Sequence, residues 1–180
     1  MNIANKISMF RIFLVPMFLI FLLADILPLG RHIAIGIFVF ASLTDALDGY
    51  LARSKNLITN FGKFLDSVAD KILICAALVA LVELDLLPSW VAIVIISRDF
   101  ILMTFRMIAS ASNIVIASDK MGKIKTILQM IMIIHLMLMI NTPFMELVGN
   151  FLIGMVVFLT IASCINYIIK NVSILGLEKI

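Results

Sequence analysis

The chain has 180 residues, of which 63% are hydrophobic and only 14% are charged, and its formal net charge is +3. A water-soluble domain of this length cannot cover so much apolar surface, so the composition excludes an ordinary soluble protein and predicts a chain surrounded mostly by lipid. The length suits one domain spanning residues 1–180.

Six apolar segments approach the length of about 20 residues that a membrane-spanning helix needs. They lie at roughly 7–27, 32–52, 66–84, 88–109, 122–141 and 146–169. Pro28, Pro88 and Pro143 mark connections between them, and Pro16 requires a kink to be accommodated inside the first. No cleavage-site pattern follows the first segment, so we interpret it as a spanning helix. The sequence thus predicts an all-α, polytopic membrane protein with six transmembrane helices.

The basic residues predict how these helices are oriented. With six spans both termini share one side, and the basic residues assigned to it are Lys6, Arg11, Arg53, Lys55, Lys63, Arg106, Lys120, Lys123, Lys125, Lys170 and Lys179. The opposite connections contain Arg31 as their basic residue. Both termini and the connections 53–63 and 110–121 are therefore expected on the cytoplasmic side. With no Arg- and Ser-rich transit segment in view, a bacterial cytoplasmic membrane is expected.

Four aspartates lie where the second and third predicted helices face each other across a short connection. Asp45 and Asp48 are three positions apart, and Asp66 and Asp70 are four apart, so each pair shares a helix face. Four converging carboxylates repel one another, and two divalent cations supply the missing positive charge. Oxygen ligands without Cys or His indicate Mg²⁺ or Mn²⁺, and two such ions suit displacement at phosphorus.

Small and basic residues around the aspartates are consistent with a bound nucleotide. Gly49 and Gly62 leave room for its close approach, and Arg53, one turn beyond Gly49, is placed to reach a phosphate oxygen. A structural alternative makes Asp66 the cap of the third helix and pairs Lys71 with an aspartate. That alternative accounts for one or two carboxylates and not for four facing ones.

The complete pattern is D-x2-D-G-x2-A-R-x8-G-x3-D-x3-D, at Asp45, Asp48, Gly49, Ala52, Arg53, Gly62, Asp66 and Asp70. In this pattern the chain resembles the CDP-alcohol phosphotransferase family. The resemblance implies a six-helix membrane fold, usually homodimeric, whose site opens to the cytoplasm and laterally to lipid. It also implies attack of an alcohol hydroxyl on the β-phosphorus of CDP-diacylglycerol, with release of CMP.

The resemblance further implies roles for individual residues. The four aspartates would bind the metal ions, and Asp70 would also be the catalytic general base. The residues implied to contact the CDP group are Asn5, Ser8, Asp48, Gly49, Arg53 and Gly62. The stretches 5–16, 98–106 and 122–129 resemble the phosphatidylglycerophosphate synthase branch of the family, with Ser8 in place of Thr and Asp99 in place of Glu. Ser67 departs from the Pro that is common in that branch.

Three cations at the cytoplasmic ends of the fourth and fifth predicted helices, Arg106, Lys123 and Lys125, suit a phosphate on the acceptor alcohol. Together with the branch resemblance they favour glycerol 3-phosphate; phosphatidylglycerol, as in cardiolipin synthase, and inositol phosphate stay as alternatives. The same cations would also anchor helix ends among lipid headgroups. For Arg98 and Asp99 two interpretations stay open, a buried ion pair or an Asp99 that orients a cation near the site.

A divalent-cation channel or transporter is the alternative of another class, because acidic residues within a membrane can line an ion path. The clustering of the aspartates at one face, the lack of an acidic relay across the membrane and the lack of internal repeats oppose it. Cys75 and Cys164 have no metal-ligand spacing and are expected to be small core residues. Packed or interfacial positions are expected for His32 and His135. The expected partners are lipids, the two substrates and a second copy of the chain, and not nucleic acid.

Overall fold

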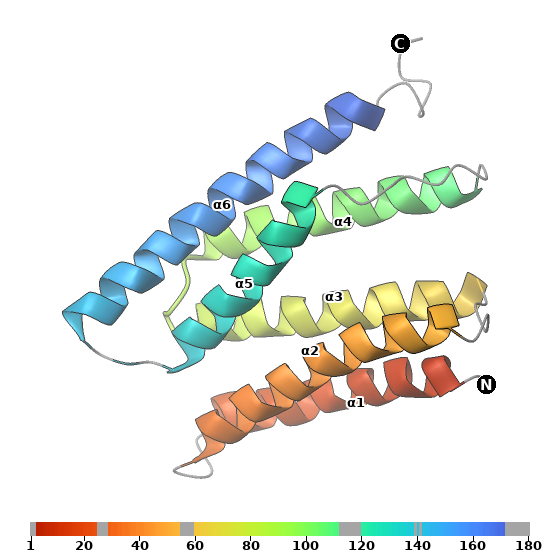
Figure 1. Ribbon diagram of the computed structural model, residues 1–180. Helices are drawn as coiled ribbons and strands as arrows, with labels where there is room; N and C mark the ends of the chain where they lie inside the picture. The colour runs from red at the N-terminus through yellow and green to blue at the C-terminus, as the bar shows by residue number, and fades with distance from the viewer. Residues whose placement is uncertain are drawn as a thin grey trace. The chain divides into compact units, whose positions relative to one another are not determined.

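The computed structural model describes the backbone of residues 3–24, 29–54, 60–111, 120–138, 140 and 142–171. Side chains are described over 8–24, 29–44, 68–109, 121–138, 140 and 142–171. The backbone so described is entirely helical apart from short connections, and confirms the all-α expectation (Figure 1). Its six helices are α1 (Ile3–Leu23), α2 (Gly30–Ser54), α3 (Asn60–Glu83), α4 (Ser89–Ala111), α5 (Lys120–Leu138) and α6 (Pro143–Asn171).

The start of α3 tests the structural alternative in which Asp66 caps the third helix. Helix α3 begins at Asn60, six residues before Asp66. The suggestion that Asp66 caps this helix is therefore wrong, because an N-cap residue precedes the first helical turn. Asp66 lies in the helix interior, where capping does not explain a carboxylate.

The far end of α3 closes with a backbone motif that fits its sequence. Asp85 has a φ of 57°, in the left-handed region that Asp and Asn tolerate better than most residues. The N–H of Leu86 donates to the carbonyl of Leu81 at 2.9 Å, which satisfies a carbonyl of the last turn. At the other connection, Pro143 is the first residue of α6, where its fixed φ and missing N–H cost little.

The chain divides into two compact units, Met1–Leu87 and Pro88–Ile180. In the first unit α1 packs against both α2 and α3. Phe18 and Phe38 are fully buried there, with ring centroids 5.9 Å apart. Fully buried alanines, among them Ala41 on α2 and Ala77 on α3, leave little side-chain bulk between the helices. The first unit therefore holds together the two helices that carry the aspartate motif.

In the second unit α6 packs against both α4 and α5. Its core contains Ile95 from α4, Met132 and Ile133 from α5, and Val156 from α6, each fully buried. His135 on α5 lies 3.0 Å from the carbonyl oxygen of Met145 on α6. Since a carbonyl only accepts, Nε2 of His135 carries the hydrogen in this contact. The packed position expected for His135 is thus observed.

Two helices within the described residues are long and apolar enough to cross a membrane, Met121–Leu138 and Pro143–Asn171. Only 22% of the second span is buried within the protein. Its outward side chains include Phe144, Phe151 and Phe158, each more than 60% exposed. A core helix of a soluble protein would bury such residues, so this surface fits lipid as its solvent.

Candidate active site

The aspartate motif lies on the facing ends of two consecutive helices in the first unit. Asp45 and Asp48 belong to α2, and Asp66 and Asp70 belong to α3. Asp48 comes six residues before the end of α2, and Asp66 comes six residues after the start of α3. At 1.5 Å per residue both are about 9 Å from their helix ends, so they lie at matching depths if the helices form a hairpin.

The side chains of most residues assigned to the metal ions and the CDP group lie outside the part that the structure describes. This holds for Asn5, Asp45, Asp48, Gly49, Arg53, Gly62 and Asp66. Among the described side chains no three His, Cys, Asp or Glu residues gather as a metal site. The helical backbone nevertheless places each aspartate pair on one face of its helix, as the spacing predicts.

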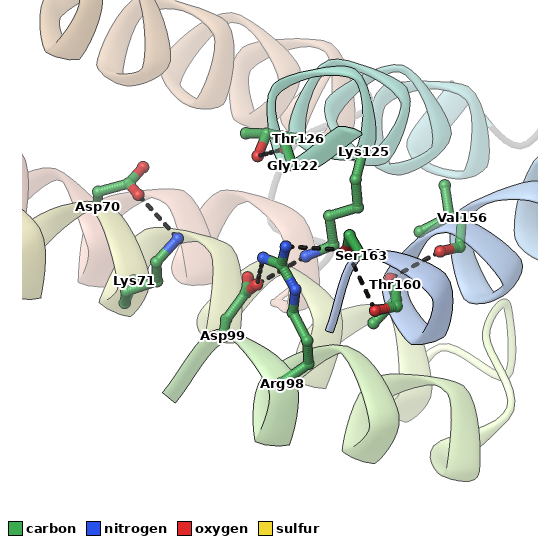
Figure 2. A network of polar contacts seen from close by, with 10 residues as sticks. All are labelled: Asp70, Lys71, Arg98, Asp99, Gly122, Lys125, Thr126, Val156, Thr160 and Ser163. Carbon is green, nitrogen blue, oxygen red and sulfur yellow. Dashed lines mark hydrogen bonds and ion pairs between the residues drawn. The ribbon is translucent and has the colours of Figure 1, made fainter. Parts of the chain in front are cut away.

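Asp70 is the motif aspartate whose side chain is described. Its Oδ2 lies 3.1 Å from Nζ of Lys71, and both side chains are about a quarter exposed, at 26% and 25% (Figure 2). The suggested pairing of Lys71 with an aspartate is confirmed for this one carboxylate. A half-buried carboxylate that water can reach is able to exchange a proton with a substrate hydroxyl.

Helix α1 buries a polar pair beside its apolar core. Ser8 is 2% exposed and Arg11 is 1% exposed. They are three positions apart and therefore lie on the same side of α1, the helix that packs against α2 and α3. Burying a guanidinium in a helical bundle is costly unless polar groups surround it. Ser8 and Arg11 therefore place buried polar groups on one side of α1 near its start.

The three cations assigned to the acceptor phosphate lie in the second unit and differ in exposure. Arg106 and Lys123 are exposed, whereas Lys125 is 1% exposed. Arg106 places its guanidinium carbon 5.9 Å from the ring centroid of Tyr167, within reach of a cation–π interaction. The structure thus leaves two of the three cations at the surface and buries the third.

Lys125 belongs to a buried ion cluster with Arg98 and Asp99, shown in Figure 2. Nζ of Lys125 donates to Oδ1 of Asp99 at 2.7 Å. Nη1 of Arg98 donates to the same oxygen at 2.9 Å, and Nη2 of Arg98 donates to Oγ of Ser163 at 2.9 Å. The buried-ion-pair interpretation of Arg98 and Asp99 is confirmed, and the pair extends to α5 and α6.

Sequence reasoning missed the polar face of α6. Thr160, Ser163 and Tyr167 are buried at spacing i, i+3 and i+7, so they share one side of the helix. Thr160 donates to the carbonyl of Val156 at 2.6 Å, and Ser163 donates to that of Thr160 at 3.2 Å. The spacing of these three polar residues in an otherwise apolar segment is the signal that identifies this face.

Comparison with protein families matches residues 1–163 to the CDP-alcohol phosphatidyltransferases. The chain belongs to this family. CDP-alcohol phosphatidyltransferases are enzymes that generally use divalent cations, so this chain is an enzyme. Its apolar helices and its family indicate that it is associated with a membrane. The family resemblance inferred from the aspartate motif is confirmed.

Relatives within the CDP-alcohol phosphatidyltransferases match almost the whole chain. A CDP-diacylglycerol–glycerol-3-phosphate 3-phosphatidyltransferase from Bacillus subtilis is 42% identical, covering 94% of this chain and 95% of its own. One of the same name from Haemophilus influenzae is 39% identical, covering 93% and 91%. A probable phosphatidylglycerophosphate synthase from Mycobacterium tuberculosis is 32% identical, covering 97% and 84%.

Proposed function

We propose that this enzyme transfers the phosphatidyl group of CDP-diacylglycerol to sn-glycerol 3-phosphate, giving phosphatidylglycerophosphate and CMP. The observation that carries the reaction is the complete aspartate motif on the facing ends of α2 and α3. The acceptor is supported by the names of the Bacillus subtilis and Haemophilus influenzae relatives, which cover this chain almost completely.

We propose further that two divalent cations, Mg²⁺ or Mn²⁺, are held by the four aspartates. The donor set fits such ions, because it offers carboxylate oxygens from two helix faces and no thiolate or imidazole. The interior position of Asp66 supports this use, since helix capping does not account for its charge. When bound, these cations supply charge neutralisation to the diphosphate and polarise its P–O bond.

In this proposal Asp70 is the general base and also one of the ligands of the divalent cations. Its carboxylate takes the proton of the acceptor hydroxyl while the hydroxyl oxygen bonds to the β-phosphorus of CDP-diacylglycerol. The bond from that phosphorus to the bridging oxygen breaks, and CMP leaves with the electron pair. Lys71, 3.1 Å from Asp70, holds the carboxylate in one orientation from the adjacent position.

We propose contacts to the CDP group from α1, α2 and α3. The residues are Asn5, Ser8, Asp48, Gly49, Arg53 and Gly62. Ser8 is buried on the helix that packs against α2 and α3, which supports a place beside the nucleotide. Glycines at the two helix positions allow the nucleotide to approach the backbone, and Arg53 would bind a phosphate oxygen.

For the acceptor phosphate we propose the cations Arg106, Lys123 and Lys125. Arg106 and Lys123 are exposed and able to meet a soluble anion directly. Lys125 is 1% exposed and donates to Asp99 at 2.7 Å, so a soluble anion does not reach its ammonium in this structure. A direct contact is therefore supported for the first two cations, and Lys125 takes part from its buried position.

We also propose that residues 1–180 act as one polytopic membrane domain with six spanning helices. The exposed apolar side chains of α1 and α4 support lipid contact beyond the two spans that stand out by length and composition among the described residues. The basic residues support cytoplasmic termini and a cytoplasmic site. A homodimer in a bacterial cytoplasmic membrane is the assembly we propose.

The experiment is CMP release by purified enzyme with CDP-diacylglycerol and Mg²⁺, with each acceptor supplied in turn. Glycerol 3-phosphate is expected to support release, and inositol phosphate and phosphatidylglycerol are not. Release with one of the latter alone would keep the reaction and replace the acceptor. No release with any acceptor from folded protein would favour the cation-transport alternative.

A further inference from the structure

The buried ion cluster of the second unit combines charges from two helices on a single oxygen. Oδ1 of Asp99 accepts from Lys125 at 2.7 Å and from Arg98 at 2.9 Å. The side chains of Lys125, Asp99 and Arg98 are 1%, 7% and 12% exposed. Removing one partner from such a buried group is costly, because the remaining charges lose their compensation inside the protein.

The cluster joins all three helices of this unit. Asp99 and Arg98 are on α4, Lys125 is on α5, and Ser163, which accepts from Arg98 at 2.9 Å, is on α6. Helix α5 also comes close at Gly122, where an added Cβ would lie 3.4 Å from Nη2 of Arg98. The Asp99 carboxylate thus links α5 directly to α4, in addition to the packing of both helices against α6.

We propose that Asp99 is a positioning residue for the acceptor phosphate, which it serves by holding α4 and α5 in the register that presents Arg106 and Lys123. This inference rests on the proposed function. It assigns Asp99 no contact with either substrate, and it assigns Lys125 an indirect part in acceptor binding.

The helical geometry connects the cluster to both exposed cations. Lys123 precedes Lys125 by two residues, about 200° around α5, so burial of Lys125 turns Lys123 outward. Arg106 follows Asp99 by seven residues, close to two full turns along α4. Arg106 is held against Tyr167, which shares the polar face of α6 with Ser163. A change at Asp99 therefore alters the rotation of both helices that carry phosphate-binding cations.

Direct and indirect roles of Lys125 give opposite predictions for Asp99→Asn. If Asp99 positions the helices, its loss raises the KM for glycerol 3-phosphate. If Lys125 contacts the phosphate directly, Asp99→Asn frees its ammonium, and that KM falls or stays the same. Lys125→Met raises the KM in both cases, since it removes the cation and keeps the apolar stem.

The experiment measures kcat, both KM values and thermal midpoints in detergent for the wild type, Asp99→Asn, Asp99→Glu, Lys125→Met and the double variant Asp99→Asn/Lys125→Met. We expect Asp99→Asn to raise the KM for glycerol 3-phosphate about tenfold or more, with the KM for CDP-diacylglycerol within about twofold. Asp99→Glu, which keeps the negative charge on a longer side chain, is expected to raise the KM for glycerol 3-phosphate by less than Asp99→Asn does. In the Lys125→Met background, Asp99→Asn has a smaller effect than alone, because the two residues act through one contact.

The matched control is Glu146→Gln, which neutralises an exposed carboxylate in the first turn of α6 and leaves every kinetic constant unchanged. An unchanged or lowered KM for glycerol 3-phosphate in Asp99→Asn overturns the positioning role, as does a loss of thermal stability without a KM change. If Asp99→Asn does not fold, Asp99→Glu decides: a KM for glycerol 3-phosphate equal to or below the wild-type value overturns the positioning role. A wild type that releases no CMP with glycerol 3-phosphate overturns the proposed function and this inference with it.

Discussion

Ser163 on α6 accepts a hydrogen bond from Arg98 on α4 at 2.9 Å, which ties the last helix to the charged centre of the fourth. Ser163 is itself buried and donates to the carbonyl of Thr160 within α6. The Ser163 hydroxyl therefore both accepts and donates a hydrogen bond inside an apolar helix bundle. The relationship shows that α6, whose sequence is dominated by apolar residues, contributes polar structure as well as lipid-facing surface.

Asp70→Asn tests the general base. The amide cannot take the proton of the acceptor hydroxyl and is a poorer cation ligand, so turnover is expected to fall about a thousandfold or more. The fold is expected to survive, because Asp70 and Lys71 form a partly exposed pair that contributes about 1 kcal/mol or less. CMP release and the thermal midpoint are measured on the same preparation.

Glu83→Gln is the control for this variant, since Glu83 is an exposed carboxylate at the other end of α3. It is expected to retain wild-type turnover. Near-normal turnover in Asp70→Asn, with the control also active, would show that another residue takes the proton.

Arg106→Ala and Lys123→Ala test the acceptor site. Each removes an exposed cation, and each is expected to raise the KM for glycerol 3-phosphate about tenfold while changing kcat little, which is the pattern of lost ground-state binding. Initial rates of CMP release over a range of glycerol 3-phosphate concentrations measure both constants. Unchanged acceptor kinetics in both variants would instead support anchoring of these cations among lipid headgroups.

The contact of α5 with α6 at Gly149 limits the size of the side chain that can stand at this position. A Cβ at Gly149 would lie 3.5 Å from Nε2 of His135 and 3.5 Å from a methyl group of Leu136, which is ordinary contact. Gly149→Ala is therefore expected to be neutral or stabilising, given the higher helix propensity of Ala. Gly149→Leu is expected to destabilise the protein by about 1–3 kcal/mol through overpacking.

Gly154 provides the matched comparison on the same helix, because nothing lies within 4 Å of an added Cβ there. The thermal midpoint in detergent is expected to fall for Gly149→Leu and to stay at the wild-type value or rise for Gly154→Leu. Equal midpoints for the two leucine variants would contradict the close α5–α6 approach.

Tyr167→Phe tests a buried hydroxyl. Within the described residues the Tyr167 hydroxyl oxygen is buried without a hydrogen-bond partner, while its ring packs edge-on against Phe105 with centroids 6.4 Å apart. Removing an unsatisfied hydroxyl and keeping the ring is expected to leave the thermal midpoint unchanged or to raise it. Tyr167→Ala loses the ring contacts with Phe105 and Arg106 and is expected to lower it. A lower midpoint for Tyr167→Phe would show that the hydroxyl binds a water molecule or ligand.

The six helices follow from the sequence because long apolar runs and prolines are strong signals, yet their ends differ. Helix α3 starts at Asn60 and not at 66, because Asn60, Gly62 and Lys63 interrupt the apolar residues of its first turns and hydropathy does not mark them. Helix α6 starts at Pro143, which hydropathy reasoning assigned to a connection although Pro favours the first helical position. The sequence predicts six spans, and among the described residues two stand out by length and composition; α4 contains the charged residues Arg98, Asp99 and Arg106.

The candidate site is predictable where its chemistry depends on spacing within one helix. Each of the two aspartate pairs is of this kind, and the motif that contains them indicated the family. The cluster of Asp99, Lys125 and Ser163 depends on which faces of three helices meet, and no single segment contains that information. Grouping Lys123 with Lys125 by position alone ignored the rotation between them, which buries one and exposes the other.

The most direct test of the central claim is formation of phosphatidylglycerophosphate from CDP-diacylglycerol and glycerol 3-phosphate by the purified enzyme, before and after removal of divalent cations with EDTA. We expect product and CMP in equal amounts, loss of both with EDTA, and recovery on adding Mg²⁺ or Mn²⁺ to the wild type but not to Asp70→Asn. Product formation that persists in EDTA, or that Asp70→Asn supports at the wild-type rate, would contradict the account.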